Sequence, residues 1–248
     1  MKIRIKFRKY GVMKFIGHLD IMRFFQKAVR RSGIDICYSE GFSPHQVMSF
    51  AAPLGVGITS DGEYLDIEVH QSDSSEASMA GLNAVMPHGM EITGYVQLDD
   101  KAKAAMSVVS AADYEIWHKN SAQVPECLRD AGFLSQQLQE FFEKPQQVLV
   151  AKKTKKSEKT MDLKQLVYDF QILPPNAQSG GMPVYYLNAS TGSTDNLKPE
   201  LALEAFYRHM GLEFDAACVQ IHRKDVYFTD AGGVNRPLLE AGKEIRQS

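Results

Sequence analysis

Hydrophobic and polar residues alternate strictly over the first eight positions of the chain. Ile3, Ile5 and Phe7 would point to one side of a strand, and the basic residues at positions 2, 4, 6 and 8 to the other. Over residues 18–31 the apolar residues instead recur at helical spacing, and Gly33 follows as a stop signal. The main apolar positions of this segment are Leu19, Met22, Phe25 and Val29. The pattern predicts a half-buried strand followed by an amphipathic helix.

The next stretch completes one βαββαβ order. Its expected elements are short extended segments at 35–39 and 47–51, an alternating strand at 62–69, a helix around 79–86 and a strand at 91–98. Pro87 and Gly89 end the helix.

The same order is predicted a second time after a small-residue linker at 99–112. The expected elements are a strand at 113–118, a helix at 124–143, a hairpin pairing 147–151 with 163–172, a strand at 183–188, a helix from Pro199 to Met210 and a strand at 217–228. Two such passes predict an α+β fold made of tandem ferredoxin-like units, each with an antiparallel sheet covered on one face by two helices. We therefore expect an N-terminal unit over 1–98, a C-terminal unit over 113–228 and a flexible tail over 229–248.

The composition is that of an ordinary globular protein, with 44% hydrophobic and 23% charged residues in 248. The longest nearly apolar run, 48–58, has eleven residues, whereas a membrane-spanning helix needs about 20. The first residues lack the uninterrupted apolar stretch of a secretory signal. The three cysteines lie far apart in sequence, without the spacing of a disulfide framework or a zinc site. These features predict a cytoplasmic protein without a membrane segment.

The charge is distributed unevenly along the chain. Residues 1–50 contain ten Lys or Arg and three Asp or Glu, so this segment has net charge +7 and the remainder −9, which together give −2. On the predicted first helix the cations Arg23, Lys27, Arg30 and Arg31 share one stripe that a phosphate backbone could follow. The basic residues of the first strand allow two interpretations: an RNA-binding sheet face, or cross-strand ion pairs with Asp66 and Glu68.

A second basic cluster lies in a predicted loop or hairpin tip. It begins with Lys152 and Lys153 and continues to Lys159. Such a run is usually only solvated, but it would extend a nucleic-acid groove if it lay on the same side as the helix stripe.

The segment FIGHLDIMRFFQKAVRRSGIDICYSEGFSPHQVMSFAAPLGVG resembles the bacterial radical SAM-associated, or radical SAM-linked, family, also described as DUF2344. The residues that carry the resemblance are His18, Leu19, Asp20, Gly41, Phe42, Pro44, His45, Ser49, Phe50 and 53–55. Later segments, SEKTMDLKQLVYDF, TGSTDNLKPELALEAF and VQIHRKDVYF, are also similar to that family, so the resemblance covers about residues 2–228. Gly17 and the pair Gln46–Val47 depart from its usual pattern. The resemblance implies association with a radical SAM protein.

The loop that carries this motif contains the candidate chemical groups. His45 and His18 are candidate acid–base or positioning residues, and Phe42 is available for stacking on a base. With Cys37 the two histidines match no standard metal spacing, so no metal is expected. Ser39 and Ser43 have no visible Asp–His arrangement.

The sequence contains no CxxxCxxC cluster motif, no GxGxxG and no P-loop. The chain therefore does not qualify as a radical SAM enzyme itself, and no cofactor is expected.

These observations favour an accessory RNA-binding module that works with a radical SAM protein and is not an enzyme on its own. One alternative is a metal-independent RNA-processing or RNA-modifying enzyme that uses His45 and His18. Another is a pure protein-interaction subunit. We expect the partner to bind the second unit at Asn196, Lys198, His222 and Arg223.

Overall fold

The computed structural model describes residues 1–153, 158–192 and 195–246. The chain forms two compact units: residues 1–111 together with 223–248, and residues 112–222. Both boundaries fall inside strands, β5 (Val109–His118) and β10 (Val219–Thr229). The described part is mixed α/β, with six α-helices and mostly antiparallel strand pairs. The expectation of purely antiparallel pairing is wrong for one strand pair, which is parallel. Parallel pairing is possible only for strands that no tight hairpin connects. None of the helices in the described residues is long and apolar enough to cross a membrane.

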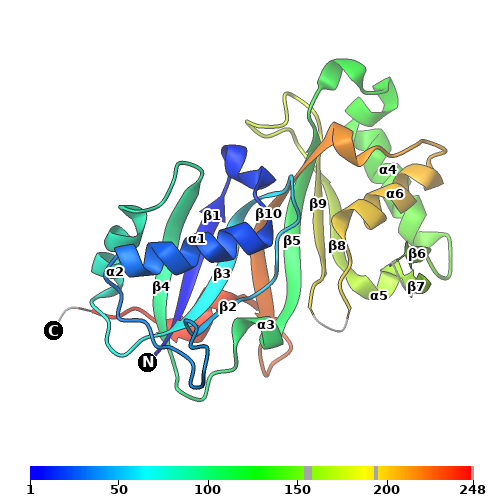
Figure 1. Ribbon diagram of the computed structural model, residues 1–248. Coiled ribbons are helices and arrows are strands. Elements are labelled where there is room, and N and C mark those ends of the chain that lie inside the picture. Colours follow the sequence, from blue (N-terminus) through cyan, green and yellow to red (C-terminus); the bar gives the residue numbers. More distant parts are fainter. Residues whose placement is uncertain (154–157, 193–194, 247–248) are drawn as a thin grey trace. The chain divides into compact units, whose positions relative to one another are not determined.

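The first unit contains the elements predicted for the N-terminal half (Figure 1). They are β1 (Lys2–Lys9), η1 (Gly11–Phe15), α1 (His18–Arg31), β2 (Met48–Phe50), β3 (Thr59–Glu68), α2 (Ser75–Asn83) and β4 (Met90–Leu98). Strand β1 pairs antiparallel with β3 on one side and β4 on the other, and β2 pairs antiparallel with β3. The segment predicted as a linker is not irregular throughout, because it contains α3 (Ala105–Val108) and the first residues of β5.

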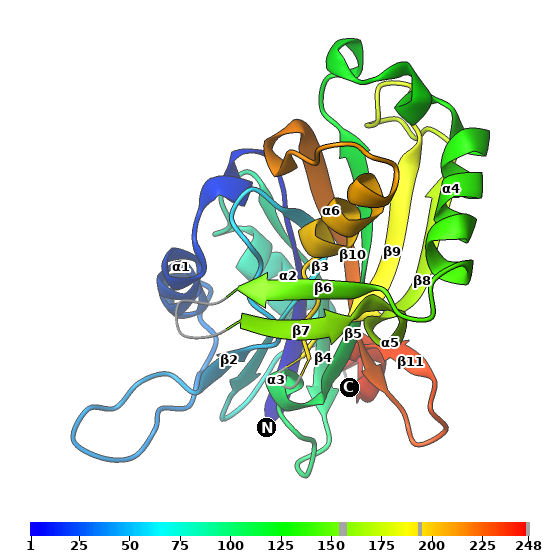
Figure 2. The same ribbon diagram turned by 90° about the vertical axis from the view of Figure 1, so that its right-hand side faces the viewer.

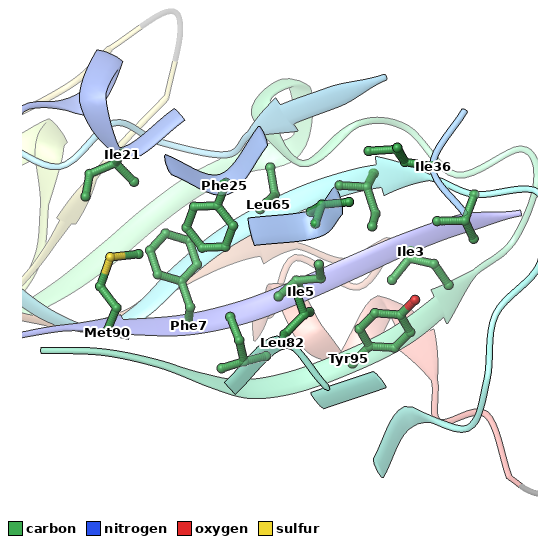
Figure 3. Packing of buried hydrophobic residues seen from close by; sticks show 14 residues of the cluster. Ile3, Ile5, Phe7, Ile21, Phe25, Ile36, Leu65, Leu82, Met90 and Tyr95 are labelled. Atoms are coloured by element: carbon green, nitrogen blue, oxygen red, sulfur yellow. The ribbon is translucent and has the colours of Figure 1, made fainter. Parts of the chain in front are cut away.

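The core of this unit lies between the strands and the helices α1 and α2, which cover one face of β1, β3 and β4 (Figure 1). Figure 3 shows Ile3, Ile5 and Phe7 of β1 pointing toward these helices, and the rings of Phe7 and Phe25 have centroids 4.8 Å apart. The expectation that Leu19 belongs to the buried face of α1 is wrong, because this side chain is 61% exposed. The fully buried positions of the helix are Ile21, Phe25, Ala28 and Val29.

The opposite face of β1 is covered by the C-terminal segment. The guanidinium of Arg4 is 1% exposed, donates to both oxygens of Asp66 at 2.8 and 2.9 Å, and donates to the carbonyl of Leu238 at 3.0 Å. Residues after Thr229, predicted as a flexible tail, form β11 (Asn235–Pro237), η5 (Leu238–Ala241) and β12 (Gly242–Lys243). Strand β12 pairs with β4, and Leu238 is fully buried. Burial of apolar surface therefore holds the segment in place.

The second unit has an additional hairpin. Its elements are η2 (Ser121–Gln123), η3 (Glu126–Arg129), α4 (Ala131–Glu143), β6 (Leu149–Lys153), β7 (Glu158–Asp162), α5 (Leu163–Leu166), β8 (Val167–Leu173), β9 (Val184–Ser190), α6 (Pro199–His209) and η4 (Ala216–Cys218). The predicted pairing of 147–151 with 163–172 is wrong: β6 pairs with β7, and β8 pairs with β9. Asp162 explains the difference, because its side chain accepts the N–H of Lys164 and starts α5 between the two hairpins.

Helices α4 and α6 pack together through aromatic side chains. Helix α4 starts at Ala131 rather than at residue 124, because Asp130 accepts the N–H groups of Gly132 and Phe133 as an N-cap. The ring of Phe141 lies 5.6 Å from that of Phe206 in α6. These contacts form the apolar layer that covers β8 and β9.

Candidate nucleic-acid interface

The exposed side of α1 is a stripe of cations. Arg23, Lys27, Arg30 and Arg31 are all exposed, on the side opposite the buried positions of the helix. Arg23 forms one exposed ion pair with Asp20 at 3.2 Å, which contributes little in water. Among the described residues Lys27 has no acidic partner. The stripe therefore keeps most of its positive charge, as the sequence predicts.

The motif loop follows α1 and extends away from the strands (Figure 2, blue, between α1 and β2). Its stem is a short antiparallel pairing in which Ser39 donates to the carbonyl of His45 at 2.8 Å and Val47 to that of Cys37 at 2.9 Å. Phe42 is fully exposed. An aromatic ring that is exposed in this way is available for stacking on a base.

A hydrogen bond ties this loop to the cationic helix. The buried Gln46 side chain donates from Nε2 to the backbone carbonyl of Gln26 at 3.2 Å. Arg30 donates from Nε to the same carbonyl at 3.3 Å. The structure thus brings together two features that the sequence suggested separately, the basic stripe and the loop carrying Phe42 and His45.

The His45 imidazole is exposed and held by one serine. Its Nδ1 lies 2.8 Å from the Ser39 hydroxyl oxygen, which also accepts the backbone N–H of His45 at 3.1 Å. Because that oxygen already accepts a hydrogen bond, its own proton can be donated to Nδ1. Nε2 then carries the ring proton and has no partner among the described residues.

His18 does not join His45. Its half-buried ring packs edge-on against Phe50 at 5.1 Å, and it does not line the cavity beside the loop. No hydrogen bond or ring contact is described between His18 and His45, the two candidate acid–base residues. In the described part no group of three His, Cys, Asp or Glu residues is placed to hold a metal ion.

A cavity of about 330 Å³ opens beside the loop within the first unit. Its polar lining includes Ser39, His45, Glu68, Lys2 and Lys103, and its apolar lining comes from Val47, Met48, Ile67, Leu98 and Ala104. The sequence indicated Lys2 only as one of the alternating cations of the first strand, and it did not indicate Lys103. Nothing in the local pattern joins them to this cavity, because they meet only when β1 and the segment after β4 fold together.

The remaining cations of β1 are neutralised. Lys6 pairs with Asp225 at 2.6 Å, and Arg8 with Asp61 at 2.7 Å. Together with the buried Arg4–Asp66 pair, these contacts support the ion-pair interpretation of this face over an RNA-binding surface. Of the two predicted acidic partners, Asp66 pairs with Arg4. The partners of Lys6 and Arg8 are instead Asp225 and Asp61, which were not predicted.

The predicted partner residues have different environments. Asn196 and Lys198 are exposed in front of α6, and His222 is half-buried with its ring 6.3 Å from that of Trp117. The prediction that Arg223 lies on a partner-binding surface is wrong, because this residue is 3% exposed and donates to Glu63. The backbones of Lys152 and Lys153 belong to β6, while their side chains lie outside the described residues.

Comparison with known protein families gives a match over residues 2–199 to the family described as an uncharacterized protein conserved in bacteria, DUF2344. No curated protein matches the chain.

Proposed function

The chain belongs to the DUF2344 family of bacterial proteins, and on this premise we propose that it is an accessory RNA-binding protein that works with a radical SAM protein. One observation carries the RNA part: the exposed cations of α1 lie next to the loop with the exposed Phe42. The radical SAM part rests on the resemblance of the motif segments to the radical SAM-associated family.

The surface offers both parts of single-strand recognition. The cations at positions 23, 27 and 30 span about 10 Å along the helix, enough to meet successive phosphates. Phe42 would stack on a base, and such stacking tolerates any sequence. The cavity lined by His45 and Lys2 would then receive a neighbouring group of the strand.

We also propose that both units are ferredoxin-like. What supports this is the strand order β4-β1-β3, with β2 beside β3, in the first unit. In the second unit the order is β10-β5-β9-β8. Each order is the one that a βαββαβ chain adopts when helices cover one face of an antiparallel sheet.

The test of RNA binding is charge reversal in the stripe. The variant Arg23→Glu/Lys27→Glu should lower affinity for a labelled single-stranded RNA by at least tenfold at 50 mM salt, because two attractive phosphate contacts become repulsive. Fluorescence anisotropy measures the affinity. The control Lys164→Glu/Lys243→Glu changes the net charge equally at exposed positions that do not belong to α1. Equal affinity of both variants would reject the stripe as the binding surface.

A second candidate function follows from the hydrogen bond between Ser39 and His45. A serine hydroxyl next to an imidazole is the start of an acid–base site, so the RNA-processing alternative keeps a specific observation in its favour. The proposal predicts that purified protein leaves total cellular RNA unchanged. Reproducible cleavage that His45→Ala slows by roughly 10²- to 10⁴-fold would replace it with the enzyme alternative.

A protein partner needs exposed apolar surface, and the first unit provides it at η1 and the start of α1. Val12, Phe15 and Leu19 are 71%, 63% and 61% exposed. Such a group is typical of an interaction surface, and we place the partner here rather than at Arg223. Coexpression with the radical SAM protein of the same cell, followed by size exclusion, should give co-elution that Phe15→Asp/Leu19→Asp abolishes. Loss of co-elution only in Asn196→Ala/Lys198→Ala would return the surface to the second unit.

A further inference from the structure

The second unit contains a cavity that neither the RNA surface nor the partner surface uses. Its volume is about 380 Å³, within the range of small-molecule sites. It lies at the end of β5, between the η3 region and the segment that follows α6. Apolar walls come from Val124, Pro125, Leu128, Leu212 and Phe214.

A nearly buried histidine lines this cavity. His118 is 8% exposed, and its Nε2 lies 2.7 Å from the hydroxyl of Tyr207, which in turn lies 3.1 Å from the hydroxyl of Tyr185. Burial lowers the pKa of His118 and raises the pKa of Tyr207 to about 12, so both groups are neutral at pH 7.

The other ring nitrogen of His118, Nδ1, has no hydrogen-bond partner among the described residues. Since His118 lines the cavity, its Nδ1 is left to hydrogen-bond a molecule that enters it. Neutral imidazole carries one donor and one acceptor nitrogen, so it suits an uncharged hydrogen-bonding edge.

The rim of the cavity carries more negative than positive charge. Glu213 and Asp215 are exposed there, and the backbone N–H of Ala217, followed by the Cys218 thiol, holds the pKa of Asp215 below its usual value. The one cation among the described residues that line the cavity, Lys119, already donates to the carbonyl of Ala217 at 3.0 Å. Two carboxylates can accept hydroxyl groups but repel a phosphate.

We propose that this cavity binds a neutral nucleoside. The base lies between the apolar walls with its hydrogen-bonding edge at Nδ1 of His118, and the ribose hydroxyls point to Asp215 and Glu213. The half-buried ring of Phe214, which packs edge-on against Tyr207 at 5.2 Å, supplies an aromatic surface for the base. The inference does not depend on RNA binding by α1.

Calorimetric titration of the full chain with adenosine, guanosine, cytidine and uridine tests the proposal. At least one should bind, and its 5′-monophosphate should bind at least tenfold more weakly. Leu128→Trp fills the cavity and should abolish binding. Tyr207→Phe keeps the ring but removes the hydroxyl that holds His118, and should weaken binding severalfold. His209→Gln changes an exposed histidine outside the cavity and should leave the affinity unchanged.

Wild-type protein alone also gives a decisive readout. Nuclear magnetic resonance of the histidine rings should show a shift of the His118 signal on addition of the bound nucleoside. Absence of binding for all four nucleosides at millimolar concentration overturns the proposal, as does a monophosphate that binds equally well. Displacement of the nucleoside by an RNA oligonucleotide would also overturn the proposal, because the phosphates of the strand should be repelled by Asp215 and Glu213.

Discussion

At the residue scale, three charged side chains are buried together in the first unit. Arg223 donates from Nε to Glu63 at 2.9 Å, and Lys9 is 2% exposed with its ammonium 2.7 Å from the carbonyl of Ile16. Burial lowers the pKa of Lys9, partly offset by Glu63. Glu63 thus interacts with two buried cations, so its loss should matter more than the loss of either cation.

Glu63→Gln should lower the free energy of unfolding by about 3–5 kcal/mol, because it removes the buried carboxylate to which Arg223 donates and whose charge lies near the buried Lys9. Arg223→Met should cost less, since Lys9 remains to pair with Glu63. Urea denaturation measures both values. Arg8→Gln, which breaks half-exposed pairs, should cost less than about 1 kcal/mol. A larger loss for Arg223→Met than for Glu63→Gln would contradict this account.

His118 gives the stability a pH dependence. Its folded-state pKa is lowered by burial, so the unfolded chain binds this proton at higher pH than the folded protein. The stability that the protein gains from burying neutral His118 is fully present above the unfolded-state pKa of about 6.5. It is lost as the pH falls toward the lower folded-state pKa. Between pH 7.5 and 5.5 the wild type should lose more unfolding free energy than His118→Phe. Equal losses in the two proteins would show that His118 does not titrate on unfolding.

At the element scale, the C-terminal segment acts as part of the first unit. Strand β12 adds to the edge of β4, and Ile245 donates to the hydroxyl of Ser75 at 2.8 Å. The fit requires glycine at position 242, because an added Cβ would lie 2.8 Å from the carbonyl oxygen of Gln97. The segment therefore closes a sheet edge that would otherwise be open to other chains.

Leu238→Ala should lower the free energy of unfolding by about 2–5 kcal/mol, because it removes a fully buried side chain and leaves a cavity. Thermal and urea denaturation both report the change. Val234→Ala, at an exposed position of the same segment, is the matched control and should change stability by less than about 0.5 kcal/mol. If Leu238→Ala left the stability unchanged, the prediction of a flexible C-terminal tail would be supported instead.

At the scale of the whole molecule, the positive charge of the first fifty residues is only partly available. Arg4, Lys6 and Arg8 are used in ion pairs, whereas the stripe on α1 remains exposed. Although the net charge of the chain is −2, the exposed side of α1 is therefore locally positive. Local charge, not net charge, sets the affinity for a polyanion.

RNA affinity should fall by about 50-fold between 50 and 200 mM salt, as expected for about four phosphate contacts on a single strand. Anisotropy titrations at several salt concentrations give the slope. Arg23→Glu/Lys27→Glu should reduce the slope to half or less. An affinity independent of salt would contradict electrostatic binding at the stripe.

The sequence alone determined those elements whose pattern of hydrophobic and polar residues is contained within the element. The alternation of β1, the helix over residues 18–31 and the exposed side of that helix follow from periodicity, which requires no knowledge of neighbours. Pairing and burial required the tertiary structure. The partner of β8, the place of the C-terminal segment and the buried pair of Arg223 with Glu63 depend on contacts between residues far apart in sequence. The cavity at His118 belongs to the same class, since its walls come from segments nearly one hundred residues apart and no local pattern encodes their meeting.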